Sequence, residues 1–130
     1  MANPVVFISH WTIKAGKLDD LRQLAREVAT RIEAEKPRTL TFLNYLDDRG
    51  TRATFVHVFA DPDSMDLHFQ GADERSRSAL EFMDPDGWEI YGQASDAALG
   101  SLRRMAESAR VPLTLRPDFL AGFLRHVPDD

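Results

Sequence analysis

The chain is predicted to be a small α+β domain, with a ferredoxin-like antiparallel sheet and helices on one face of that sheet. Strand-like and helical segments follow in the order strand, helix, strand, strand, helix and later strand, which is the split βαβ pattern. The strands are apolar on both of their faces, so each face of the sheet needs a cover. With 130 residues, 43% of them apolar, the chain can form one core without disulfides or metals.

The first half of the chain is expected to supply three strands and the longest helix. Residues 5–13 are rich in β-branched and aromatic side chains and predict a strand. Apolar residues at helical spacing predict a helix over residues 18–35. Two further strand-like runs, 39–46 and 51–60, are joined by a predicted hairpin turn in which Gly50 suits the left-handed position.

A second helix is predicted to begin at Asp61 and Pro62, because Asp is a favourable N-cap and Pro is tolerated at the first helical position. His68 and Phe69 follow on the inward stripe of this helix. Gly71 is expected to interrupt it.

The last third of the chain carries weaker signals. Residues 84–87, Asp-Pro-Asp-Gly, predict a turn, and residues 88–91 predict a short strand after it. Ser95 is a predicted cap of a third helix. Residues 111–125 are strand-like, and their prolines would confine parts of this run to a sheet edge.

Composition and motifs exclude several classes of function. The chain has no cysteine, which rules out disulfides and Cys-ligated metal centres, and its net charge of −5 argues against nucleic acid as a partner. No apolar stretch approaches the roughly 20 residues of a membrane-spanning helix, and no signal peptide is recognised, so a cytoplasmic protein without a membrane partner is expected. The GxSxG, P-loop and GxGxxG motifs are absent.

His57 is the main candidate for a catalytic residue. It lies in an otherwise apolar strand, on the same face as Phe55 and Phe59. An imidazole titrates near neutrality, so His57 could act as a general base toward a phenol or enol. The alternative is a histidine that is satisfied in the core or at a dimer contact.

His10 lies in the first strand and would be a cross-strand neighbour of His57 if register and face agree, which would give a two-histidine site. Zinc or iron normally needs a third protein ligand, and the sequence has no HExxH or HxH spacing, so no metal is expected. His126 is too near the C-terminus to count on.

Further candidates could line a pocket. Asn44 could donate a hydrogen bond to a substrate carbonyl, and Trp11 could form an aromatic wall, although packing explains Trp11 equally well. Arg75 and Arg77 are most simply explained as a solvated helix face.

Over about residues 4–75 the sequence resembles the dimeric α+β barrel superfamily, and in particular its antibiotic biosynthesis monooxygenase-like branch. The similarity is carried by the stretches Ala15–Asp20 and Glu35–Leu40 and by the spacing of Phe59, Asp61 and His68. The resemblance implies a homodimer whose two sheets close a barrel, with an apolar pocket between sheet and helices in each subunit. It also implies one domain over residues 1–130, with a core of about 4–92 and a C-terminal elaboration of about 93–126.

Two positions depart from the pattern of the branch. His57 stands where many members carry a glutamate on the third strand, and Asp73 stands where a second helical histidine often occurs. Because of both departures, the reported mechanisms of the branch are not carried over to this chain.

Three functions remain open at this stage. The first is a monooxygenase without a cofactor, acting on a small aromatic or polyketide/quinol-like substrate, with His57 as base and Asn44 as hydrogen-bond donor. His10, Trp11, His68 and Phe69 would then contact the substrate. The second is a non-catalytic, ligand-binding or stress-associated dimer with structural histidines. The third is haem binding or degradation, in which His68 resembles the axial ligand.

Overall fold

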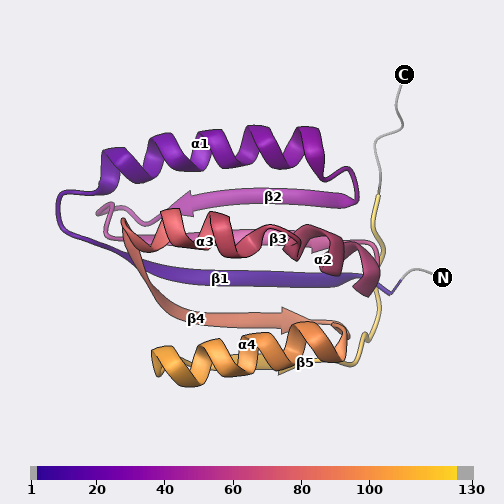
Figure 1. Cartoon of the computed structure of the whole chain (residues 1–130). Coiled ribbons are helices and arrows are strands. Elements are labelled where there is room, and N and C mark those ends of the chain that lie inside the picture. Colours follow the sequence, from indigo (N-terminus) through magenta and orange to yellow (C-terminus); the bar gives the residue numbers. More distant parts are fainter. Residues whose placement is uncertain (1–2, 126–130) are drawn as a thin grey trace.

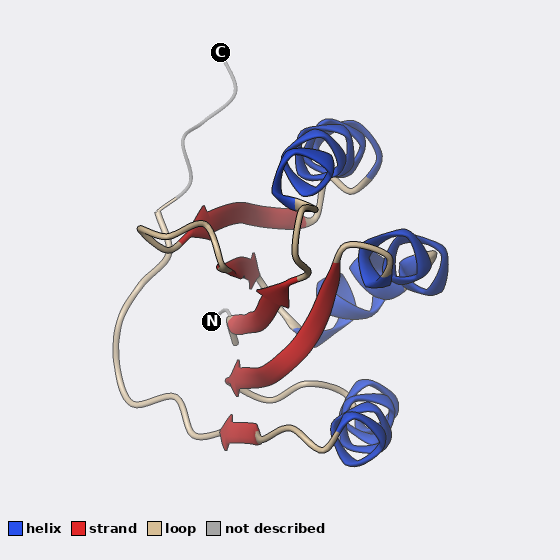
Figure 2. Ribbon diagram, turned by 90° about the vertical axis from the view of Figure 1, so that its left-hand side faces the viewer, coloured by secondary structure: helices blue, strands red, loops and turns tan. Residues whose placement is uncertain are grey.

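A computed structural model describes residues 3–125 of the chain, except for the side chains of residues 73 and 76. Its elements are β1 (Val5–Ile13), α1 (Leu18–Glu35), β2 (Thr39–Leu46), β3 (Arg52–Phe59), α2 (Pro62–Phe69), α3 (Ala72–Leu80), β4 (Met83–Tyr91), α4 (Asp96–Ala109) and β5 (Leu113–Arg116). The strands form one sheet in the order β2-β3-β1-β4-β5 (Figure 1). All helices lie on one side of it (Figure 2), so the predicted α+β architecture is confirmed.

The central strand β1 divides its side chains between the two faces of the sheet. Its odd-numbered residues, from Val5 to Ile13, are buried beneath the helices, whereas its even-numbered residues face the other side and are half-buried or exposed. β1 pairs antiparallel with β3, and Phe7 lies opposite His57. Residues that are paired across strands share a face, so His57 also points toward the helices.

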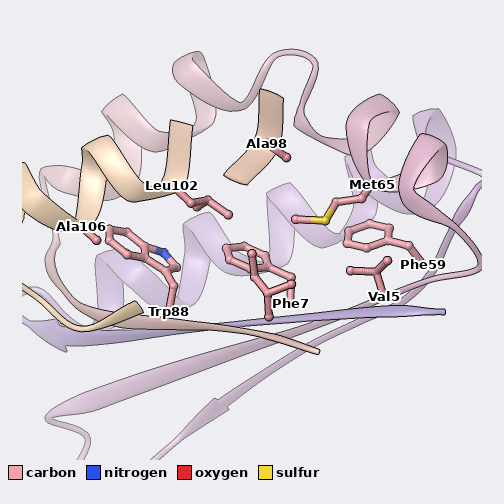
Figure 3. Close-up of a cluster of buried hydrophobic side chains, with 9 residues drawn as sticks. Val5, Phe7, Phe59, Met65, Trp88, Ala98, Leu102 and Ala106 are labelled. Atoms are coloured by element: carbon pink, nitrogen blue, oxygen red, sulfur yellow. The ribbon is translucent and has the colours of Figure 1, made fainter. Parts of the chain in front are cut away.

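A large hydrophobic cluster lies between the sheet and the helices α2 and α4 (Figure 3). Its members come from the strands β1, β3 and β4 and from the helices α2 and α4: Val5, Phe7, Phe59, Met65, Trp88, Ile90, Ala98, Leu102 and Ala106. The three α4 residues recur every fourth position, which places them on one helix face. Burial of each large apolar side chain contributes roughly 1.5–3 kcal/mol.

The predicted helix cap and hairpin turn are confirmed. The Asp61 side chain accepts a hydrogen bond from the Ser64 amide at 2.8 Å and caps α2. In the hairpin, the Asp47 carboxylate accepts from the Thr51 amide at 2.8 Å, and Gly50 has a positive φ of 66°.

The turn predicted at residues 84–87 is wrong, because β4 runs through this segment from Met83. Pro85 is tolerated there because β5 pairs with β4 only from Trp88 onward, which leaves the earlier part of β4 with a free edge where no amide donor is needed. The pairing of β1 with β4 shifts register between His10 and Trp11, as expected for a β-bulge.

The strand predicted over residues 111–125 is much shorter in the structure. β5 covers Leu113–Arg116 and pairs parallel with β4, so the sheet has a fifth strand and is not purely antiparallel. Pro117 follows directly, and the chain then continues without regular structure on the side of the sheet opposite the helices (Figure 2). Here Leu120 is 96% exposed and Phe123 is 77% exposed.

Among the described helices, none is long and apolar enough to cross a membrane.

Candidate functional site

A cavity of about 230 Å³ lies between the sheet and the helix layer. Its walls are mainly apolar and aromatic side chains from the strands β1 to β4 and from all four helices. The polar side chains that line it are Ser9, Asn44, His57, His68, Arg75 and Ser101. An apolar pocket with a few polar groups is the usual form of a small-molecule site.

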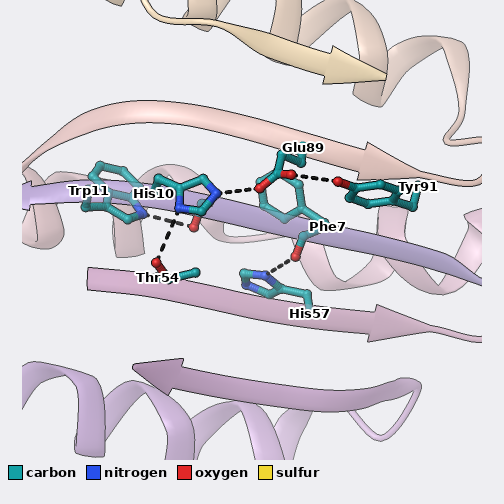
Figure 4. Close-up of polar contacts among 8 residues, drawn as sticks. Phe7, His10, Trp11, Thr54, His57, Glu89 and Tyr91 are labelled. Atoms are coloured by element: carbon teal, nitrogen blue, oxygen red, sulfur yellow. Dashed lines mark hydrogen bonds and ion pairs between the residues drawn. The ribbon is translucent and has the colours of Figure 1, made fainter. Parts of the chain in front are cut away.

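His57 is held in one tautomer by the neighbouring strand. Its Nδ1 donates to the Phe7 carbonyl oxygen at 3.0 Å (Figure 4), so Nε2 carries the lone pair and is the ring's acceptor. Burial lowers the pKa of His57 to about 4, with a further lowering by the charge of Arg75, while the bond to Phe7 opposes the shift. The imidazole is therefore neutral at pH 7.

His68 lies beside His57, with ring centroids 5.0 Å apart and an edge-to-face orientation. The helix α2 directs it inward, as predicted, and its Nδ1 is 2.8 Å from the Thr39 hydroxyl. Burial lowers the pKa of His68 to about 3, and the nearby His57, Arg75 and Lys36 lower it further. The cavity thus contains two neutral imidazoles.

Asn44 supplies an unsatisfied polar group. β2 pairs with β3 so that Asn44 lies opposite Phe55 and shares the cavity face. The Asn44 Oδ1 atom is buried and has no hydrogen-bond partner among the residues that the structure describes. An unpaired buried acceptor costs on the order of 1–3 kcal/mol, so a ligand that donates a hydrogen bond there would remove this cost.

Aromatic rings form much of the cavity wall. Trp11 contacts Trp88 edge-to-face at 6.4 Å between centroids, and Phe69 contacts Phe7 in the same way at 5.4 Å. The Trp11 indole donates to the Ser9 hydroxyl at 2.9 Å, which fixes the ring and leaves the hydroxyl proton of Ser9 free to donate. Trp11 and Phe69 therefore both lie in the cavity wall, and their contact with a substrate stays a prediction.

His10 does not join this site, and its predicted pairing with His57 is wrong. It lies opposite Thr54 in the register and on the face of the sheet away from the helices, because neighbouring residues of a strand point to opposite faces. There it bonds to Glu89, whose other oxygen accepts from the Tyr91 hydroxyl at 2.6 Å (Figure 4). These hydrogen bonds from Tyr91 and His10 lower the pKa of Glu89. His126 lies outside the described residues.

Arg75 is half-buried and lines the cavity, so its prediction as part of a solvated face is wrong, whereas Arg77 is exposed. The chain bends between α2 and α3 at Gly71, where φ is +82°, and this brings Arg75 back to the carbonyl groups at the end of α2. Burial lowers the pKa of Arg75, and Arg31 lowers it further, while Glu35 opposes the shift.

Sequence reasoning also missed Ser9 and Trp88 as cavity residues. Ser9 shares its strand parity with Trp11, and Trp88 lies opposite Ser9 in the sheet. The alternation of side chains along β1 could have identified Ser9 as a cavity residue. Trp88 could be placed only from the register of β4 with β1. Among the side chains that the structure describes, no three His, Asp or Glu residues are grouped to hold a metal ion.

The site can bind a flat apolar molecule, accept a proton at His57 Nε2 and receive a hydrogen bond at Asn44. A neutral imidazole fixed by a backbone carbonyl is suited to accept a proton from a bound hydroxyl group. The positive charge of Arg75 would stabilise the anion that results.

No model of a known protein family and no curated protein sequence matches the chain. Solved structures do match it. MupZ from Pseudomonas fluorescens has a TM-score of 0.70 at 15% identity, covering 95% of this chain and 95% of MupZ. SnoaB, a cofactor-independent oxygenase from Streptomyces nogalater solved as an asparagine-to-alanine variant, has a TM-score of 0.59 at 14% identity, covering 72% and 96%.

A proposed antibiotic biosynthesis monooxygenase from Deinococcus radiodurans has a TM-score of 0.58 at 17% identity, covering 70% of this chain and 93% of its own. The chain therefore has the α+β fold of antibiotic biosynthesis monooxygenase-like proteins, and the resemblance seen in the sequence is confirmed at the level of the fold. At these identities the likeness extends to the fold alone, since one fold supports many functions.

Proposed function

We propose that the chain is an enzyme that deprotonates a small aromatic or quinol-like hydroxyl compound and lets the resulting anion react with molecular oxygen, without a cofactor. The observation that carries this proposal is the fixed tautomer of His57, whose acceptor Nε2 belongs to a ring that lines an aromatic cavity. The similarity of fold to SnoaB, described as a cofactor-independent oxygenase, supports the same reaction class.

The proposed reaction balances without an external reductant. His57 Nε2 takes the phenolic proton, and the electron pair moves to a ring carbon that forms a bond with one oxygen atom of O₂. The imidazolium returns its proton to the distal oxygen. The O–O bond then breaks, water leaves with the hydrogen of that ring carbon, and the carbon becomes a carbonyl. A phenol and O₂ thus give a quinone and water.

The low pKa of His57 disfavours the imidazolium in the chain by itself, and an anion formed beside the ring would raise this pKa. Without a partner, a protonated His57 would be costly in its buried position. A phenolate next to the imidazolium forms an ion pair, and Arg75 adds a second positive charge at the same cavity. Asn44 would hold the substrate by accepting a hydrogen bond, or by donating one through its amide nitrogen.

The size of the cavity limits the substrate. In other proteins an apolar cavity of about 150 Å³ accommodates benzene, so about 230 Å³ fits one or two rings. Pockets for drug-sized ligands usually exceed about 300 Å³. A porphyrin is larger than such ligands, so the volume of the cavity does not favour the haem function.

A second candidate is a ligand-binding protein without catalysis. It is favoured by the packing of His57, whose ring lies 5.0 Å from the rings of both Phe7 and Phe42, as a core aromatic side chain would. In that case His57→Phe would be tolerated and ligand binding would persist.

Oxygen consumption separates the two candidates. The purified chain would be given mono- and bicyclic phenols and quinols in an oxygen electrode, and the products identified by mass spectrometry. We expect quinone formation, with a loss of about 100-fold or more in kcat for His57→Gln, and no comparable loss for the control His10→Gln, which lies on the opposite face of the sheet. Turnover that survives His57→Gln would remove the base assignment, and ligand binding without oxygen uptake would favour the second candidate.

We also propose that the sheet face away from the helices pairs with a second copy of the chain. Val6, Ile8, Val56 and Val58 lie on this face, and Tyr45 beside them is 56% exposed. Apolar sheet faces need a cover, and a self-complementary contact provides it. The C-terminal segment, in which Leu120 and Phe123 are exposed, runs on the same side of the sheet (Figure 2) and would extend the covered surface.

A further inference from the structure

The lining of the cavity is positively charged, whereas the chain as a whole is acidic. The chain carries 21 Asp and Glu residues and 16 Lys and Arg residues. None of the acidic residues lines the cavity among the side chains that the structure describes, and Arg75 is the one lining residue there with a permanent charge. With His57 and His68 neutral at pH 7, the described lining side chains carry one net positive charge, that of Arg75.

Arg75 is a cation without a carboxylate partner at bonding distance in the described part of the chain. Its Nη2 donates to the His68 carbonyl at 2.6 Å and its Nη1 to the Gln70 carbonyl at 3.3 Å. These two neutral acceptors take two of the five guanidinium N–H donors, and no described side chain is hydrogen-bonded to the others. The charge of Arg75 lowers the pKa of both His57 and His68, so its field reaches the polar end of the cavity.

From these contacts we infer that the pocket selects small aromatic carboxylates that also carry a hydroxyl group. The carboxylate would pair with Arg75, since guanidinium groups bind carboxylates with parallel hydrogen bonds. The hydroxyl would donate to the unpaired Asn44 Oδ1 or to His57, and the ring would lie between the aromatic walls. This inference rests on the proposed function and narrows its substrate class.

A purely structural role for Arg75 is the rival explanation. Arg75 and Lys36 both donate to carbonyl groups at the C-terminal end of α2, and cations commonly satisfy such groups. The two roles differ in what can replace the side chain. A neutral amide can donate to a carbonyl group, whereas an attraction for a carboxylate needs a positive charge.

Binding can be followed with the two tryptophans of the chain, because Trp11 and Trp88 both line the cavity. 4-Hydroxybenzoate and its methyl ester would be titrated separately, with tryptophan emission as the signal and calorimetry as confirmation. The ester keeps the ring and the hydroxyl group and lacks the charge. We expect the acid to bind at least about 10-fold more tightly than the ester to the unmodified chain.

The variants test the residue itself. Arg75→Gln should abolish the preference for the acid while leaving the dissociation constant of the ester within about two-fold, and Arg75→Lys should retain part of the preference. Arg77→Gln, an exposed arginine of the same helix, is the matched control and should keep the full preference. Thermal unfolding of each variant would verify that it is folded.

The inference is overturned by equal affinities for acid and ester, by a preference that persists in Arg75→Gln, or by binding of neither compound. These outcomes are distinct from failure of the proposed function. Tight, Arg75-dependent binding of the acid without oxygen uptake would retain the inference and remove the oxygenase. Oxidation of neutral phenols without any preference for acids would remove the inference and retain the oxygenase.

Discussion

The Nδ1 atom of His57 lies 3.0 Å from the carbonyl oxygen of Phe7, its partner across the β1 and β3 strands. Burial, against the effect of this bond, keeps the histidine in its neutral form, and this makes stability depend on pH. The pKa of His57 is about 4 in the folded chain, compared with roughly 6.5 for an unfolded histidine. Between these values the unfolded state binds more protons, so the free energy of unfolding falls as the pH falls.

We therefore predict that His57 contributes to a loss of stability below about pH 6.5. Between pH 7.5 and 4.5 this contribution should be on the order of 2–3 kcal/mol. Urea unfolding at both pH values would measure it, with His57→Phe for comparison. Over this pH range the free energy of unfolding should fall by about 2–3 kcal/mol less in the variant than in the unmodified chain. An equal fall in the two proteins would contradict the assignment.

The cap of α2 predicts that two aspartates at the start of this helix contribute differently to stability. Asp61 accepts hydrogen bonds from the Ser64 amide and hydroxyl, whereas Asp63 is exposed in the first turn. Asp61→Ala should lower the free energy of unfolding by about 1–2 kcal/mol, and the control Asp63→Ala by less than about 1 kcal/mol. Chemical denaturation of both variants would show whether the order holds.

Substitution by alanine is expected to change the stability of the fold in opposite directions at two glycines. A Cβ atom at Gly92, where φ is +94°, would lie 2.3 Å from the carbonyl oxygen of Pro4, whereas Gly100 lies within α4 and meets only the flexible end of Arg104 at 3.4 Å. Gly92→Ala should destabilise the fold by about 2 kcal/mol or more. Gly100→Ala should stabilise it by about 0.5–1 kcal/mol, and melting temperatures would reveal both signs.

The proposed pairing through the open sheet face predicts the mass in solution. Sedimentation equilibrium should give twice the chain mass of 14.7 kDa. Val56→Asp places a charge on that face and should yield a folded monomer, because an unpaired charge is costly to bury in a contact. The control Leu80→Asp, at an exposed apolar position on α3, should remain paired. A monomer for the unmodified chain at high concentration would refute the pairing.

The elements that the sequence predicted well are those with strong local signals. The helix α1 has an uninterrupted apolar stripe, the hairpin before β3 has Gly50 at its left-handed position, and Asp61 with Pro62 marks the start of α2. Each of these signals depends on residues close in the sequence. The segments 84–87 and 113–116 depended on pairing with distant strands, so local turn signals misled there.

The candidate site was predictable in part. His57, Asn44, Trp11 and Phe69 line one cavity, on faces that strand parity and helical spacing indicate, while their roles in a site stay predictions. His10 was misplaced although it adjoins Trp11, and two neighbours in a strand cannot both face one cavity. Arg75 could not be predicted as a cavity residue, because its position depends on the bend at Gly71, which only the packed structure shows.

The alternation of side chains along β3 has an evolutionary consequence. His57 and Phe55 face the cavity, while Val56 and Val58 face the open side of the sheet. Within its eight residues the strand therefore uses alternate positions for the cavity lining and for the outer surface. A lineage with this fold could change the odd positions, and with them the cavity, while the even positions and the surface that they form stay unchanged.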